Sequence, residues 1–132
     1  FDGTSWSSDI NDSYPLIDRV SAELSVTHIP SGVYKDKYML VVMENTTSGT
    51  ISYSISDTPY GPFDAYQKIY QTNEYSYLRD AFSYNAKLHP NLSNDKDFVI
   101  SYNVNTTTVG ALSDANIYYP RFIRMIEVNK KK

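Results

Sequence analysis

Three short polar-aromatic segments in the last third of the chain carry residue types that can do chemistry. They are YNAKLHP (84–90), SYNVN (101–105) and YYPRF (118–122). Each places Tyr, Asn, His or Arg at the start or the end of a β-patterned run, where a sheet can direct several side chains to one point. Core strands are mostly Val, Ile and Leu, so polar groups at matched strand ends predict a lined cavity.

Five residues of these segments form the predicted cavity wall. A tyrosine ring offers a flat face to the C–H bonds of a sugar, and Asn and Arg offer paired groups to neighbouring hydroxyls. Structural bracing is equally compatible with these residue types, because Arg can pair with Glu23 or another carboxylate and Asn can cap backbone groups at strand ends. The candidate ligand-binding residues are Tyr84, Asn85, Tyr102, Asn103 and Arg121.

Composition sets the class of protein in which such a wall would lie. A chain of 132 residues predicts one domain. The net charge of −3, without a basic stripe, argues against a nucleic-acid partner. The anomaly is 13 tyrosines, which with abundant Ser, Thr and Asn favour β-structure with wet, hydrogen-bonding surfaces. Such surfaces are common in secreted carbohydrate-active proteins, and carbohydrate is therefore the expected partner.

Several other kinds of protein are excluded or disfavoured by the sequence. No cysteine is present, which excludes disulfides and thiolate metal sites. No run approaches the roughly 20 apolar residues of a membrane-spanning helix, so we expect no membrane partner. The chain begins at Phe1 rather than Met, from which we expect a segment of a longer protein, either secreted or on the cell surface.

The elements that must position the polar residues read as strands. Alternation predicts strands over 22–28 and 51–56, and a nearly continuous apolar run predicts another over 38–43. Residues 65–70 are a fourth predicted strand. Breakers such as Pro30 and the Asn-Thr-Thr-Ser-Gly turn separate them. The first unit is therefore a four-stranded antiparallel meander over residues 22–70.

The same cycle begins again at residue 84. Strands are predicted over 84–89, 98–103 and 119–128, and the only candidate helix, over 74–82, is short and uncapped. Repeated four-stranded sheets are the sequence signature of propeller blades, which predicts an all-β fold with about two four-stranded antiparallel blades. A β-sandwich is the competing all-β architecture.

Certain segments also carry a family resemblance, over roughly residues 2–128. The chain resembles the C-terminal part of five-bladed β-propeller proteins related to the furanosidase-type glycoside hydrolases (family 43-like), which include bacterial domain families of unassigned function. The resemblance implies that residues 1–20 end a preceding blade and form a linker, that 22–70 are one blade and that 84–128 are the last. The remaining blades of the same protein would then be partners. The segments are SAELSV (21–26), DTPYGPF (57–63), YNAKLHP (84–90), SYN (101–103) and YPRF (119–122).

Glu23 is the candidate catalytic residue. It lies on the first strand of a unit among small residues, which suits a carboxylate that faces a cavity. Glycoside hydrolysis needs two carboxylates, and the resemblance implies that Glu23 is the general acid, although it lies one blade later than in the similar enzymes. The partner Asp residues would lie upstream. The plain alternative is a Glu on the wet face of an alternating strand.

His89 is the candidate metal-binding residue. The resemblance implies an axial position facing a metal ion such as calcium, or a water cluster, although hydrolysis itself requires no cofactor. A single His without other ligands is weak evidence, and a buried His bonded to a neighbouring strand is the alternative.

The sequence therefore predicts a carbohydrate-active propeller that cleaves glycosidic bonds. A carbohydrate-binding or structural propeller without hydrolysis, or a β-sandwich module, is the alternative.

Overall fold

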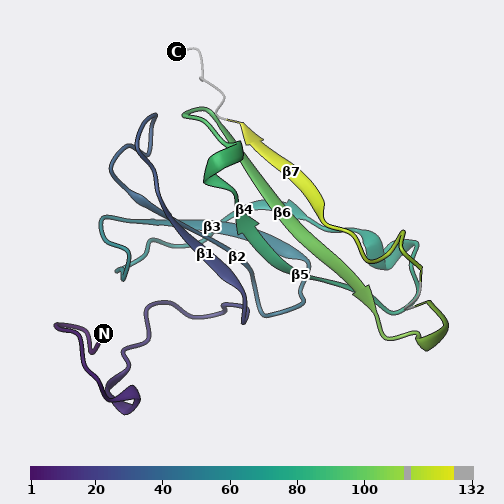
Figure 1. Cartoon of the computed structure of the whole chain (residues 1–132), viewed down its shortest axis with the longest axis horizontal. Coiled ribbons are helices and arrows are strands. Elements are labelled where there is room, and N and C mark those ends of the chain that lie inside the picture. Colours follow the sequence, from purple (N-terminus) through teal and green to yellow (C-terminus); the bar gives the residue numbers. More distant parts are fainter. Residues whose placement is uncertain (112–113, 127–132) are drawn as a thin grey trace.

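The computed structural model describes residues 1–111 and 114–126 and shows an all-β chain (Figure 1). Within those residues there is no α-helix and therefore none long and apolar enough to cross a membrane. Of four single 3₁₀ turns, η1 (Ile10–Asp12) precedes the first strand, and three lie between strands: η2 (Glu74–Ser76), η3 (Pro90–Leu92) and η4 (Val109–Ala111). The strands are β1 (Leu24–His28), β2 (Tyr38–Met43), β3 (Thr50–Ser56), β4 (Gln67–Gln71), β5 (Ala81–Leu88), β6 (Asp97–Thr106) and β7 (Arg121–Ile126).

The strands form two antiparallel sheets. The first has the order β1-β2-β3-β4 and the second the order β5-β6-β7, so that each strand pairs with its neighbour in sequence. The sheets pack against each other in a sandwich-like manner, and one hydrophobic core lies between them. The core residues include Met39, Val41, Met43, Ile51 and Tyr53 from the first sheet and Ala86, Leu88, Phe98, Ile100, Tyr102 and Val104 from the second.

The burial of each strand follows from its residue pattern. In β2, the run YMLVVM is buried along almost its whole length, because its two faces are both covered. In β6, residues 98, 100, 102, 104 and 106 are buried, whereas 97, 99, 103 and 105 are partly exposed. Successive side chains of a strand point to opposite faces, so β6 directs its even-numbered residues to the core. Removing apolar surface from water at about 25 cal/mol per Å² makes this register the stable one.

The hairpin loops β1–β2 and β5–β6 meet at Gly32. This residue has φ of +80°, and a Cβ built there would collide with the backbone oxygen of Asp95. Both the left-handed backbone and the close approach therefore require glycine. The contact places the corresponding loops of the two sheets at the same end of the molecule.

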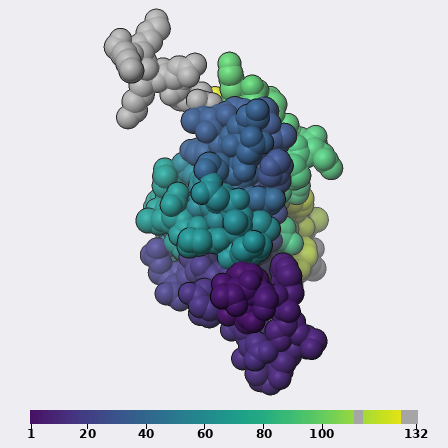
Figure 2. Space-filling view, turned by 90° about the vertical axis from the view of Figure 1, so that its left-hand side faces the viewer, coloured from purple at the N-terminus to yellow at the C-terminus, as the bar shows by residue number. Residues whose placement is uncertain are grey.

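The N-terminal segment protrudes from the body formed by the sheets, as the dark purple residues show (Figure 2). Aromatic side chains attach it. The ring of Phe1 lies 4.4 Å from that of Tyr60 and 5.7 Å from that of Trp6, which is 77% exposed. This cluster holds the segment to the rigid loop that follows β3.

The all-β prediction is confirmed, and each predicted strand is found with small shifts at its ends. The only helix candidate, over 74–82, forms no α-helix: a single 3₁₀ turn, η2, is followed by β5 from Ala81. The second sheet has three strands among the described residues, and the last two residues of the strand predicted over 119–128 lie outside them.

Candidate functional site

The edge strands β1 and β5 bring together the first part of the site. The backbone N–H of Leu88 donates a hydrogen bond of 2.9 Å to Ser25 Oγ, so the two strands lie side by side across the two sheets. Glu23, which immediately precedes β1, is partly buried, and its charge acts on Tyr84 of β5. The structure therefore places two predicted site residues, Glu23 and Tyr84, near each other.

A β-bulge in β5 shapes the site. Tyr84 is paired with Asn103 and Lys87 with Ser101, so that Asn85 and Ala86 together face one residue of β6. Asn85 occupies the bulge with φ of +60°, a left-handed conformation that Asn tolerates better than most residues. The bulge redirects the Asn85 side chain, because it interrupts the strict alternation of the strand.

The Asn85 amide is only half satisfied. Its Nδ2 donates a hydrogen bond of 3.1 Å to Asn103 Oδ1, whereas its buried Oδ1 has no hydrogen-bond partner among the described residues. It is the one such buried side-chain atom in the described part of the chain. A buried acceptor without a partner costs about 1–3 kcal/mol, so an unsatisfied oxygen in a strand bulge marks a place where a donor is expected.

Tyr84 and Tyr118 form a phenol pair at the same place. Tyr84 Oη donates a hydrogen bond of 3.4 Å to Tyr118 Oη. This hydrogen bond, followed by burial and by the negative charges of Tyr118 and Glu23, raises the pKa of Tyr84 to about 12. Tyr118 is 59% exposed, so its ring presents a face to solvent. The oxygens of the pair can accept a hydrogen bond from a further donor.

We call Glu23, Tyr84, Asn85, Asn103 and Tyr118 the bulge site. The sequence predicted a role for each of them except Tyr118. Tyr118 nevertheless belongs to the polar-aromatic segment YYPRF (118–122). The site combines a carboxylate, a free amide oxygen and two phenols. Such a set of acceptors and aromatic rings suits a neutral ligand with several hydroxyl groups.

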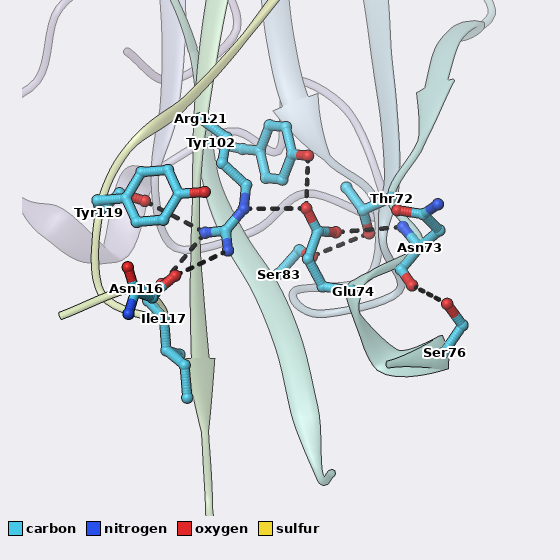
Figure 3. A network of polar contacts seen from close by, with 10 residues as sticks. All are labelled: Thr72, Asn73, Glu74, Ser76, Ser83, Tyr102, Asn116, Ile117, Tyr119 and Arg121. Atoms are coloured by element: carbon cyan, nitrogen blue, oxygen red, sulfur yellow. Dashed lines mark hydrogen bonds and ion pairs between the residues drawn. The ribbon is translucent and has the colours of Figure 1, made fainter. Parts of the chain in front are cut away.

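Tyr102 and Arg121 lie elsewhere, in a buried network with Glu74 (Figure 3). Tyr102 Oη donates a hydrogen bond of 2.7 Å to Glu74 Oε1, and Arg121 Nε lies 3.1 Å from the same oxygen. Glu74 is 3% exposed and Tyr102 also 3%. Burial and the hydrogen bond to Glu74 raise the pKa of Tyr102. We call these three residues the buried clamp.

The contacts of Tyr102 and Arg121 with Glu74 fit the alternative of structural bracing better than the predicted contact with a ligand. Tyr102 and Asn103 are adjacent in β6 and so face opposite sides of the sheet. Tyr102, directly opposite Arg121 in the register, shares the core face with it. The predicted partner of Arg121 was Glu23 or another carboxylate, and the structure gives Glu74. Glu74 was missed because its segment carried no clear strand pattern and no sign of a remote partner.

His89 follows β5 and contacts the second sheet. Its Nε2 lies 2.7 Å from Ser101 Oγ, and its ring centroid lies 5.9 Å from that of Phe122. In the described part of the chain, no group of three or more His, Asp or Glu side chains is arranged to hold a metal ion. The surroundings of His89, one hydroxyl and one aromatic ring, do not fit a metal site made by these residues alone.

A separate hollow of about 540 Å³ lies where β1 and β5 end, away from the bulge site. Ile29, Leu88 and Phe98 form its floor, and polar residues of the two touching loops form its rim. None of the predicted site residues lines it, so the sequence-based site and this hollow are distinct.

Comparison with protein families matches residues 1–128 of the chain to a domain of unknown function (DUF5005). No curated protein matches the sequence.

Proposed function

The chain belongs to the DUF5005 family, and from its geometry we propose that the bulge site binds carbohydrate. The observation that supports this most is the buried Oδ1 of Asn85, which has no donor among the described residues. Because this oxygen is closed to solvent, a sugar hydroxyl would supply that donor only when the Asn85 side chain turns outward, and binding would then recover the free energy that the unpaired oxygen costs. The native fold tolerates the cost because the bulge is held by the flanking strand pairs.

The neighbours of Asn85 support the same class of ligand. Tyr118 offers an exposed aromatic face, and Glu23 offers a partly buried carboxylate that accepts hydrogen bonds from hydroxyls. Neutral sugars carry many hydroxyl donors on a ring with apolar C–H faces. The residue types of the site thus suit both parts of such a ring.

The finer fold that we propose is part of a five-bladed β-propeller of the family 43-like type. Two features support it: each sheet is a meander in sequence order, and their first strands, β1 and β5, lie side by side. In such a fold the first strands of the blades face the axis. The bulge site would then line an axial cavity, and the remaining blades of the same protein would provide its other walls.

Hydrolysis of glycosidic bonds is the second candidate function, and Glu23 is the residue that favours it. Two carboxylates are needed, an acid and a base or nucleophile. Glu23, in the bulge site, is available for one of these roles. Glu74 is not, because its carboxylate is engaged by Tyr102 and Arg121 in the buried clamp. The second carboxylate would come from the remaining blades. No cofactor enters this chemistry, and an axial calcium ion would need ligands beyond His89.

Binding is tested by titrating the full-length protein with neutral oligosaccharides in a calorimeter, after a glycan array has identified the best one. Asn85→Gly removes the amide but keeps a residue that adopts positive φ. We expect at least a tenfold loss of affinity, which corresponds to about 1.4 kcal/mol. Asn45→Gly is the matched control, because Asn45 also has positive φ (48°) but lies in an exposed turn. Equal affinity of the two variants and the wild type would refute the assignment.

A further inference from the structure

The clamp and the bulge site are connected through one loop. Arg121 uses its Nε for Glu74, and its two terminal nitrogens turn to the loop of residues 114–120. Nη1 donates hydrogen bonds of 3.1 Å to Ile117 O and 3.3 Å to Tyr119 O. Nη2 lies 3.5 Å from Asn116 O. The Arg121 guanidinium thus contacts carbonyl groups of residues that precede and follow Tyr118 in the sequence (Figure 3).

The guanidinium itself is held in place from the other side. Glu74 fixes Nε, and the Arg121 carbon Cζ lies 4.4 Å from the centre of the Tyr119 ring. The Arg121 side chain is 11% exposed and that of Glu74 3%. A planar fork with five donors, largely buried against an aromatic ring and a carboxylate, has little freedom to move.

Tyr118 is therefore presented by a backbone that the clamp fixes. Its own side chain is largely exposed, and its one described hydrogen bond is the 3.4 Å contact with Tyr84. Because that contact is long, it does not by itself determine where the ring lies. The flanking carbonyl groups, held by Arg121, fix the backbone from which the ring projects.

We propose that Arg121 and Glu74 are positioning residues of the bulge site: through the loop of residues 114–120 they hold Tyr118 against Tyr84. The inference rests on the proposed carbohydrate binding for its functional consequence, whereas its structural part stands on the contacts alone. Neither residue touches the ligand. Both act by preorganising a ring that the ligand meets, which lowers the cost of ordering that ring on binding.

The test uses a double variant, Arg121→Met with Glu74→Met, because either change alone leaves a charge buried and threatens folding. The matched control is Arg124→Met with Asp97→Asn, which removes an ion pair between β7 and β6 whose arginine is exposed, without touching the loop. Hydrogen exchange, followed by mass spectrometry, reports the loop. The N–H of Asn116 and of Ile117 are protected by hydrogen bonds to Asp114, and we expect their exchange to accelerate about tenfold or more in the clamp variant alone.

The second readout is affinity for the oligosaccharide that the wild type binds best. Tyr118→Ala on its own removes the ring, and the clamp variant should weaken binding by about fivefold or more, up to the loss that Tyr118→Ala causes. Since the clamp acts through Tyr118, adding Tyr118→Ala to the clamp variant should cause less than the sum of the two losses. A merely structural clamp would give additive losses.

The outcomes separate the two proposals. Unchanged loop exchange in the clamp variant overturns the positioning role, whatever the affinities are. Faster exchange with unchanged affinity, or with additive losses, overturns the functional part of the inference while carbohydrate binding stands. Faster exchange in a protein that binds no glycan supports the hold on Tyr118 and refutes the proposed function.

Discussion

The bulge site and the buried clamp are built from the same materials but differ in how completely their polar groups are satisfied. Both combine tyrosine with a carboxylate, and both take residues from the second sheet. In the clamp, Glu74 accepts from Tyr102 and from Arg121, and little surface remains exposed. In the bulge site, Asn85 keeps a free acceptor and Tyr118 an open face. The difference shows that hydrogen-bond completion, more than residue type, separates bracing from binding.

The side of the strand decides which of the two a residue joins. Tyr102 and Asn103 are neighbours in β6, yet one belongs to the clamp and the other to the bulge site. Alternation sends them to opposite faces of the sheet. Mutations in the bulge site should therefore leave the clamp intact, whereas breaking the clamp reaches the bulge site only through the loop that Arg121 holds.

The largest effect is expected from breaking the clamp on one side. Arg121→Met leaves Glu74 charged and buried, which should lower the free energy of unfolding by about 3–5 kcal/mol. Urea denaturation followed by far-ultraviolet circular dichroism measures it. Adding Glu74→Met should recover most of the loss. The control Arg124→Met, which removes an arginine that is 63% exposed, should cost less than about 1 kcal/mol. Equal losses for Arg121→Met and Arg124→Met would contradict the difference between the two regions.

A smaller effect is expected at the bulge. Asn85→Gly should leave the protein at least as stable as the wild type, since it removes an unpaired oxygen and accepts φ of +60°. Asn85→Ala should be less stable than Asn85→Gly by about 1–2 kcal/mol, because Cβ disfavours the left-handed region. The same urea experiment compares them. If Ala and Gly are equivalent at position 85, the bulge has relaxed and the site loses its geometric basis.

The smallest effect concerns alkaline pH. The pKa of Tyr84 is raised to about 12, above its usual value near 10, chiefly by the hydrogen bond to Tyr118. A raised pKa in the folded state stabilises the protein fully below pH 10, and this contribution is lost as the pH rises from 10 towards 12. Tyr118→Phe should therefore lose stability less steeply than the wild type over that range. Urea unfolding at about pH 9, 10 and 11 compares the slopes; identical slopes would mean that the phenol pair does not form.

The strands were predictable because their burial patterns are strong. The run in β2 and the alternation in β6 each allow one arrangement that buries the apolar side chains. The bulge was not predictable, since the residues around Asn85 read as an ordinary continuation of β5. Register also escaped prediction, and without it Tyr102 and Asn103 were placed together although they face opposite ways.

The role of Glu74 could not be inferred because its partners are remote in sequence. It pairs with Arg121 across 47 positions, and its own segment carried a weak helical pattern. Glu23, by contrast, was singled out for its place at the start of β1, and the structure puts it beside Tyr84. Local sequence patterns thus sufficed to locate residues at strand ends. The pairing of charges that are distant in sequence could not be predicted, because it depends on how the two sheets pack.

The protruding N-terminal segment has a practical consequence for spectroscopy. Trp6 is the single tryptophan of the chain, and it lies with Phe1 and Tyr60 outside the core between the sheets. Its fluorescence will therefore follow the detachment of that aromatic cluster and the local solvent, while the sheets can remain folded. An emission change that precedes the loss of circular dichroism would be a signal from the cluster, and the molecule thus carries a built-in optical probe of its own periphery.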